Sequence, residues 1–160
     1  DDYIDKPVSR KDLIGKIERL LSASFRPVVP VPHLRKVLVV DDDPDHLVSM
    51  EKILQGQGFE VYIAESGQEG VKLARTFLPD LVLMDVMMPD MDGFSACLEI
   101  KKDRKTHDIP VIMVTSIADE FAEPEYPKKI AANHQADGFI SKPVSKEVIL
   151  DKISILLDKK

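Results

Sequence analysis

Acidic side chains follow two short apolar runs of this 160-residue chain, at Asp41-Asp42-Asp43 and at Asp85. A hydroxyl, Thr115, and an ammonium group, Lys142, come at the ends of two further apolar runs. Carboxylates are the ligands that hard divalent cations prefer, and a carboxylate can also act as a nucleophile and form an acyl phosphate. A lysine supplies a compact positive charge for phosphate oxygens. If the fold brings these side chains together, they can support phosphoryl transfer.

The elements that must position these residues follow from the hydrophobic pattern. Short apolar runs predict strands that are buried on both faces, at about 37–40, 59–63, 81–84, 111–114 and 138–141. Helical spacing and capping residues predict helices that begin near Pro44, Ser66, Phe94, Lys128 and Ser145, with an acidic loop at 117–127.

Strands that alternate with helices indicate an α/β fold with a five-stranded parallel sheet and helices on both faces. Ligands of such sheets bind at the carboxyl ends of the strands. We therefore expect one pocket to collect the carboxylates, the hydroxyl and the ammonium group.

Composition excludes several other classes of protein. The 22 Lys and Arg residues are outnumbered by 28 Asp and Glu residues, for a net charge of −6, which argues against direct binding of nucleic acid. No apolar run reaches the length needed to span a bilayer, so we expect no membrane contact. Cys97 is the only cysteine, so neither an intrachain disulfide nor a cysteine zinc site can form. A single thiol fits the reducing cytoplasm, where we expect the protein to lie.

Two segments of the chain have similar sequences, DDYIDKPVSRKDLIGKIERLLS at 1–22 and DGFISKPVSKEVILDKISILLD at 137–158. They align without a gap, and the matching residues of the first segment are Asp1, Ile4, Lys6, Pro7, Val8, Ser9, Lys16, Ile17, Leu20 and Leu21. We interpret residues 1–24 as the last strand and helix of a preceding copy of the same domain. The proline-containing stretch 25–35 is then a stiff linker, and 36–160 is the domain itself.

The motifs of the domain resemble those of the receiver domain of two-component response regulators. They are VLVVDDDPD at 37–45, DLVLMDVMMPDMDG at 80–93, VIMVTS at 111–116 and ADGFISKP at 136–143. The resemblance implies a doubly wound, flavodoxin-like sheet with the strand order 2-1-3-4-5. It also implies a signalling domain, not an enzyme with an external substrate, that catalyses its own aspartyl phosphorylation.

The family's residue roles map onto this sequence one by one. Asp85 matches the aspartate that accepts the phosphoryl group. Asp41 and Asp42 match the acidic pair that holds Mg²⁺ or Mn²⁺ together with Asp85 and the backbone carbonyl of Met87.

Four further positions carry over from the same resemblance. Thr115 and Lys142 match the hydroxyl and the ammonium group that meet the phosphoryl group, and Phe139 matches the aromatic switch residue. Pro143 matches the proline that follows a cis peptide bond.

The resemblance also implies partners. The phosphoryl donor is expected to be a histidine kinase or a histidine phosphotransfer protein, and a homodimer is compatible with this family. The parent protein could be a hybrid histidine kinase, a relay protein with several receivers, or a regulator with an enzymatic output.

Two features depart from the family pattern. Thr115 and Lys142 are 27 positions apart, a longer interval than we expect for a compact receiver domain. The additional residues fall at 118–128, so the resemblance does not define the surface of the helix that follows. Met87 and Ile117 occupy positions where receivers carry polar residues that orient water. We expect these apolar side chains to slow self-dephosphorylation.

Two other functions remain open from the sequence. A phosphohydrolase of the haloacid dehalogenase type also uses an aspartate after an apolar strand, and Asp41-Asp42-Asp43 permits that assignment, although only Asp151 and Asp158 follow the lysine. A receiver-like interaction module that works without phosphate is the second alternative.

Overall fold

The computed structural model describes residues 33–116 and 135–159. The described elements are β1 (Lys36–Val40), α2 (Pro44–Gln55), β2 (Glu60–Ala64), α3 (Gly67–Phe77), β3 (Leu81–Asp85), α4 (Gly93–Lys102), β4 (Val111–Thr115), β5 (Gly138–Ser141) and α6 (Lys146–Leu157). The acidic loop at 117–127 and the short helix predicted near 128–134 lie outside the described residues. So do the segment 1–24 and most of the linker.

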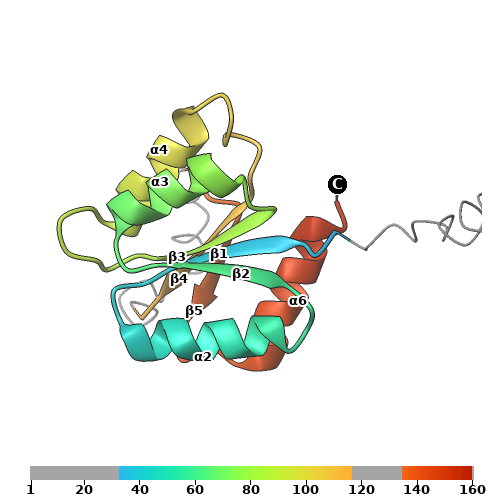
Figure 1. The fold of residues 1–160 in the computed structure, drawn as a ribbon. Coiled ribbons are helices and arrows are strands. Elements are labelled where there is room, and N and C mark those ends of the chain that lie inside the picture. Colours follow the sequence, from blue (N-terminus) through green and yellow to red (C-terminus); the bar gives the residue numbers. More distant parts are fainter. Residues whose placement is uncertain (1–32, 117–134, 160) are drawn as a thin grey trace, which may run out of the picture. The chain divides into compact units, whose positions relative to one another are not determined.

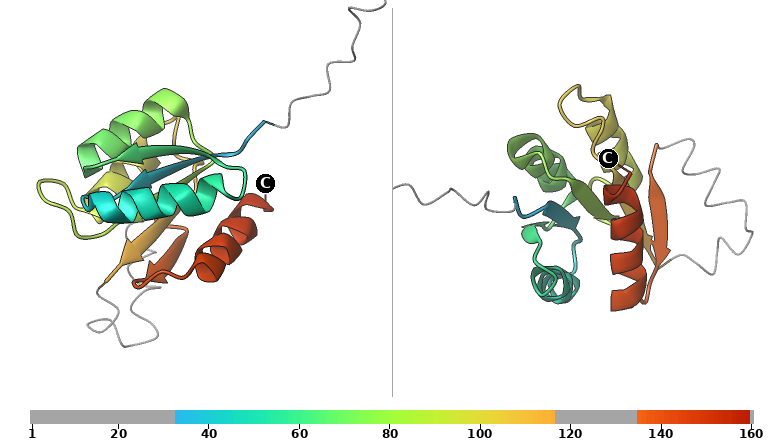
Figure 2. Two further views of the ribbon diagram at one scale, coloured as in Figure 1. Left: turned by 60° about the horizontal axis from the view of Figure 1, so that its bottom comes forward. Right: turned by 90° about the vertical axis from the view of Figure 1, so that its right-hand side faces the viewer.

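The strands form one parallel sheet in the order β2-β1-β3-β4-β5. This order confirms the predicted doubly wound topology. Figure 1 shows α3 and α4 on one side of the sheet and α2 and α6 on the other, and the views of Figure 2 show the same layers.

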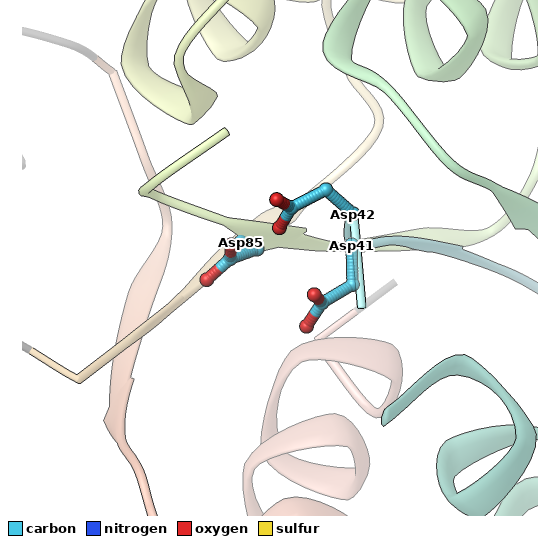
Figure 3. A group of neighbouring side chains, drawn as sticks. All are labelled: Asp41, Asp42 and Asp85. Carbon is cyan, nitrogen blue, oxygen red and sulfur yellow. The ribbon is translucent and has the colours of Figure 1, made fainter. Parts of the chain in front are cut away.

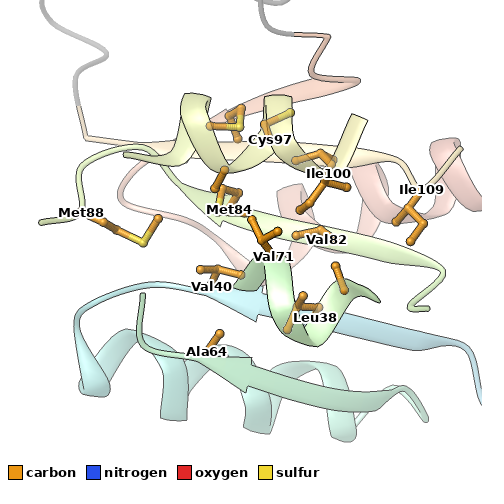
Figure 4. Packing of buried hydrophobic residues seen from close by; sticks show 14 of the residues in the cluster. Leu38, Val40, Ala64, Val71, Val82, Met84, Met88, Cys97, Ile100 and Ile109 are labelled. Atoms are coloured by element: carbon orange, nitrogen blue, oxygen red, sulfur yellow. The ribbon is translucent and has the colours of Figure 1, made fainter. Parts of the chain in front are cut away.

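The strands contribute side chains to two apolar layers, one on each face of the sheet, because successive side chains of a strand point to opposite faces. Leu38 and Val40 of β1 pack with residues of α3 and α4, a cluster that also holds Met84, Cys97 and Ile100 (Figure 4). Val37 and Val39 of the same strand pack with the residues of α2 and α6 that cover the other face: Leu47, Leu54, Ile149, Ile153 and Leu157. Each such side chain contributes roughly 1.5–3 kcal/mol when it leaves water. The sheet is therefore a rigid support for the side chains at the carboxyl ends of its strands.

Caps fix where the helices begin. Asp43, Ser66, Asp92 and Ser145 each accept a hydrogen bond from a backbone N–H in the first turn of the following helix. The sequence predicted Ser66 and Ser145 in this role, and both are confirmed. The sequence did not predict Asp92 as the cap of α4. Because Asp92 is the cap, α4 begins at Gly93, one residue before the predicted start.

The second strand is displaced by one residue from its prediction of 59–63. The backbone N–H of Phe59 bonds to the carbonyl of Leu54 and so belongs to the end of α2. Glu60 is the residue whose N–H joins β1, through the carbonyl of Arg35. Ala64 extends the strand because its carbonyl accepts the N–H of Asp41.

No helix within 33–116 and 135–159 is long and apolar enough to cross a bilayer.

Candidate functional site

The carboxyl ends of β1 and β3 bring three carboxylates together. Asp41 and Asp42 directly follow β1, and Asp85 is the last residue of β3. One oxygen from each of them lies within 4.8 Å of the others (Figure 3). In the sheet, β1 lies between β2 and β3. The cluster therefore lies at the point where the strand order reverses, which is where parallel sheets bind their ligands.

Two of the three carboxylates are buried. Asp41 is 6% exposed and Asp85 is 5% exposed, whereas Asp42 faces solvent. Burial and the charge of Asp41 raise the pKa of Asp85, and the nearby Lys142 only partly offsets this rise. The cluster thus stores like-charge repulsion that a cation would relieve.

Lys142 enters the cluster from the far edge of the sheet. Its Nζ lies 3.0 Å from Asp41 Oδ2 and 3.1 Å from Asp85 Oδ1. Burial alone would lower the pKa of Lys142, but its hydrogen bond to Asp41 and the charge of Asp85 raise it overall. The lysine therefore stays an ammonium group and bridges the two buried carboxylates.

The backbone around Lys142 holds it in this place. Its N–H bonds to the carbonyl of Thr115 at 2.7 Å, which ties the end of β5 to the end of β4. The peptide bond between Lys142 and Pro143 is cis. Thr115 itself is buried, with 8% of its surface exposed.

The other expected site residues lie around this centre. Phe139 on β5 is half-buried against the α3–α4 layer, and its ring centroid lies 6.5 Å from that of Phe94. Met87 lies two residues beyond β3, and its side chain is 62% exposed. Ile117 lies outside the described residues.

Two residues near the site were not given roles by the sequence. His46, in the first turn of α2, lies 3.1 Å from Lys142 through its Nδ1 atom. Its position three residues after Asp43, close to the acidic end of β1, was the available signal, but the sequence alone did not pair it with a lysine 96 positions away. Gly93 packs its backbone against Asp85 and donates its N–H to the Val86 carbonyl at 2.9 Å.

The donor set suits a small hard cation. All three converging groups are carboxylates, and no Cys or His belongs to the cluster found among the described residues. Mg²⁺ prefers oxygen ligands of this kind and keeps several waters beside one or two carboxylates. The residues present therefore fit Mg²⁺.

Comparison with known proteins gives a consistent result. Residues 37–154 match the model of the response regulator receiver domain. The protein PilH of Pseudomonas aeruginosa is 37% identical over 124 residues, which cover 78% of this chain and 98% of PilH. Two longer curated relatives match over only 48% of their own length.

Solved structures agree in fold. A CheY-like receiver domain protein from Methanospirillum hungatei JF-1 is 35% identical, with a TM-score of 0.69 over 79% of this chain and 95% of that one. The receiver domain of the sensor histidine kinase PA1611 from P. aeruginosa, solved with magnesium coordinated in its active site cleft, has a TM-score of 0.69. It is 22% identical and covers 78% of this chain and 98% of that one.

Proposed function

Because this chain belongs to the response regulator receiver domain family, whose members are phosphorylatable domains of two-component signalling, we propose that Asp85 accepts its phosphoryl group. The observation that carries the proposal is the position of Asp85. Its carboxylate ends the central strand β3, beside two more carboxylates and within 3.1 Å of Lys142. Asp41 and Asp42 share that cluster as the charged groups that a cation would neutralise.

The donor in this proposal is the phosphohistidine of a histidine kinase or phosphotransfer protein. A carboxylate oxygen of Asp85 attacks phosphorus as the P–N bond to the donor imidazole breaks, and the imidazole leaves and takes up a proton. This chain's part is mainly to position the reactants and to balance their charge. Lys142 supplies one positive charge, and the hydroxyl of Thr115 is assigned to the phosphoryl oxygens.

Asp41, Asp42 and Asp85 would hold Mg²⁺, with the backbone carbonyl of Met87 as a further ligand. A cation held by these residues would supply positive charge that offsets the negative charge of the transferring phosphoryl group. The magnesium ion in the cleft of the PA1611 receiver supports this assignment, as does the all-carboxylate cluster.

The signal would leave through Thr115 and Phe139. A phosphoryl group on Asp85 offers the Thr115 hydroxyl a new acceptor at the end of β4. Movement of that residue would free space for the Phe139 ring, which packs between β5 and α4. We assign the resulting change to the outer helix face as the output of the domain.

For residues 1–24 we retain the assignment to the strand and helix of a preceding receiver, joined by the linker 25–35 to the receiver at 36–160. The support is the sequence match with 137–158, which includes Lys6-Pro7-Val8-Ser9 opposite Lys142-Pro143-Val144-Ser145. The parent protein would then carry at least two receivers in tandem.

Incubation with acetyl phosphate and Mg²⁺, followed by intact mass measurement, tests the function. We expect a gain of one phosphoryl group that disappears when EDTA removes the cation and when Asp85 is replaced by Asn. Asp158→Asn, a change at the exposed end of α6, is the matched control and should leave the gain intact.

If Asp41→Asn no longer gains a phosphoryl group while Asp85→Asn gains it as the wild type does, the phosphohydrolase alternative is supported instead. If signalling by the parent protein is unchanged in Asp85→Ala, the phosphate-independent module is favoured.

A further inference from the structure

His46 contacts the centre of the site without belonging to the set of residues assigned above. It lies in the first turn of α2, where Asp43 caps the helix and Pro44 begins it. The next residue, Leu47, is 2% exposed and anchors this turn in the core. The backbone of His46 is therefore fixed, and its Nδ1 atom reaches within 3.1 Å of Lys142 Nζ.

The chemistry of the two groups gives this contact a direction. An ammonium group has three N–H donors and no acceptor, so Lys142 donates and the imidazole nitrogen accepts. The same Nδ1 atom also lies 3.4 Å from Asp41 Oδ2. Among the described residues, Lys142 Nζ has three close acceptors for its three donors: Asp41 Oδ2 at 3.0 Å, Asp85 Oδ1 at 3.1 Å and His46 Nδ1 at 3.1 Å.

These three acceptors differ once a cation is considered. Asp41 and Asp85 are both carboxylates of the cluster that fits Mg²⁺. If they bind a cation, their ion pairs with Lys142 become weaker. The imidazole of His46 is not among those oxygen ligands, and Mg²⁺ has little preference for nitrogen. His46 is thus the partner that Lys142 keeps when its carboxylate partners turn to the cation.

We propose that His46 is a positioning residue that holds the Lys142 ammonium group beside Asp85 while Asp41 ligates the divalent cation. This inference rests on the proposed function, because it takes Asp41 as a cation ligand and Asp85 as the phosphoryl acceptor. Without His46, Lys142 would compete more strongly for Asp41. Cation binding and phosphoryl transfer should then both be weakened.

The variants His46→Ala and His46→Asn test this role. Alanine removes the acceptor, whereas the asparagine side-chain oxygen can take the place of Nδ1. Because His46 lines a surface hollow and half of its side chain is exposed, neither change opens the core. Val48→Ala is the matched control, since Val48 is 45% exposed on the same helix.

The first readout is the Mg²⁺ dissociation constant, measured by titration calorimetry with no phosphoryl donor present. We expect His46→Ala to raise it about 3- to 10-fold, on the scale of a fraction of a charged hydrogen bond, and His46→Asn to restore it to within about 2-fold. The second readout is acetyl phosphate kinetics at saturating Mg²⁺. There we expect a lower kcat with little change in KM for His46→Ala, again restored by Asn.

Three results would overturn the proposal. Wild-type values in His46→Ala would show that Lys142 needs no third partner. Equal losses in Ala and Asn would show that His46 acts only through helix packing. Tighter Mg²⁺ binding in His46→Ala would show that the imidazole acts as a repelling cation instead. In each case wild-type protein that binds Mg²⁺ and gains a phosphoryl group leaves the proposed function standing, whereas wild-type protein that does neither defeats both proposals.

Discussion

Gly93 is the residue at which the loop after β3 comes closest to Asp85. A Cβ atom at this position would lie 2.0 Å from the Asp85 carbonyl oxygen, which is backbone and cannot swing aside. We expect Gly93→Ala to lower the free energy of unfolding by about 2 kcal/mol or more and to slow phosphorylation, as the strand end must shift.

Urea unfolding measures this effect, with Gly138→Ala as its control. A Cβ atom at Gly138 would meet only the Ile112 side chain at 3.7 Å, an ordinary contact. Equal stability of the Gly93 and Gly138 variants would contradict the close approach.

Ionisation of the buried Asp85 carboxyl lowers the stability of the folded protein. Burial first and the charge of Asp41 second raise its pKa above the usual aspartate value, although Lys142 pulls the other way. A folded-state pKa above the unfolded value means that the folded protein binds more protons, so this carboxyl costs stability as the pH rises through that pKa.

The variant Asp85→Asn removes this cost. In EDTA we expect it to be more stable than wild type at pH 7, with the difference shrinking as the pH falls below the usual aspartate range. Thermal unfolding across this pH range measures the difference. A variant that is less stable than wild type at pH 7 would show that the Lys142 ion pair outweighs burial.

The site residues differ in how far the sequence could predict them. The site residues that each end a strand or directly follow one are brought to one edge by the topology of a parallel sheet alone: Asp41, Asp42, Asp85, Thr115 and Lys142. His46 and the close packing of Gly93 depend on how a helix turn and a loop are placed in space. The hydrophobic pattern does not encode such distances.

At the scale of elements, Asp92 controls the start of α4. Its carboxylate accepts hydrogen bonds from the N–H and the hydroxyl of Ser95, at 2.9 Å and 3.0 Å. Burial by itself would raise the pKa of Asp92, but these hydrogen bonds outweigh it and lower the pKa. The cap therefore stabilises the fold above the usual aspartate pKa, and this stability is lost as the pH falls through the lowered, folded-state value.

We expect Asp92→Ala to cost about 1 kcal/mol at pH 7, and this cost should diminish in acid. Chemical denaturation at pH 7 and at about pH 3, just below the reference aspartate pKa, tests it. Asp108→Ala is the matched control, because Asp108 is an exposed carboxylate whose side chain is 86% accessible and lies 3.2 Å from His107 Nε2. A pH-independent loss in Asp92→Ala would contradict the capping role.

The elements themselves were largely predictable because each has a local signal. Apolar runs mark the strands, and serines, aspartates, prolines and glycines mark the helix ends. The one-residue displacement of β2 arose because Phe59 is apolar like a strand residue, yet its N–H closes the end of α2. Apolar character alone does not distinguish these two uses of a residue.

At the scale of the whole molecule, Leu34–Lys160 forms a compact unit that carries the complete proposed site. The repeat assigned to residues 1–24 would give a helix with an apolar stripe of Leu13, Ile14, Ile17, Leu20 and Leu21. Exposed apolar surface of this kind promotes association. We expect deletion of residues 1–24 to reduce self-association of the chain while Mg²⁺-dependent phosphorylation persists.

Sedimentation velocity over a range of concentrations tests this expectation. Identical sedimentation of the full chain and the shortened chain would show that the stripe drives no association.

The central claim is that the phosphoryl group is carried by Asp85, and locating the modified residue tests it most directly. Acyl phosphates are reduced by borohydride to alcohols, so a phosphorylated aspartate is converted to homoserine. After phosphorylation with acetyl phosphate and Mg²⁺, reduction and peptide mass mapping should place homoserine at position 85 and at no other aspartate. Homoserine at position 41 or 42, or none in protein that has gained a phosphoryl group, would contradict the account.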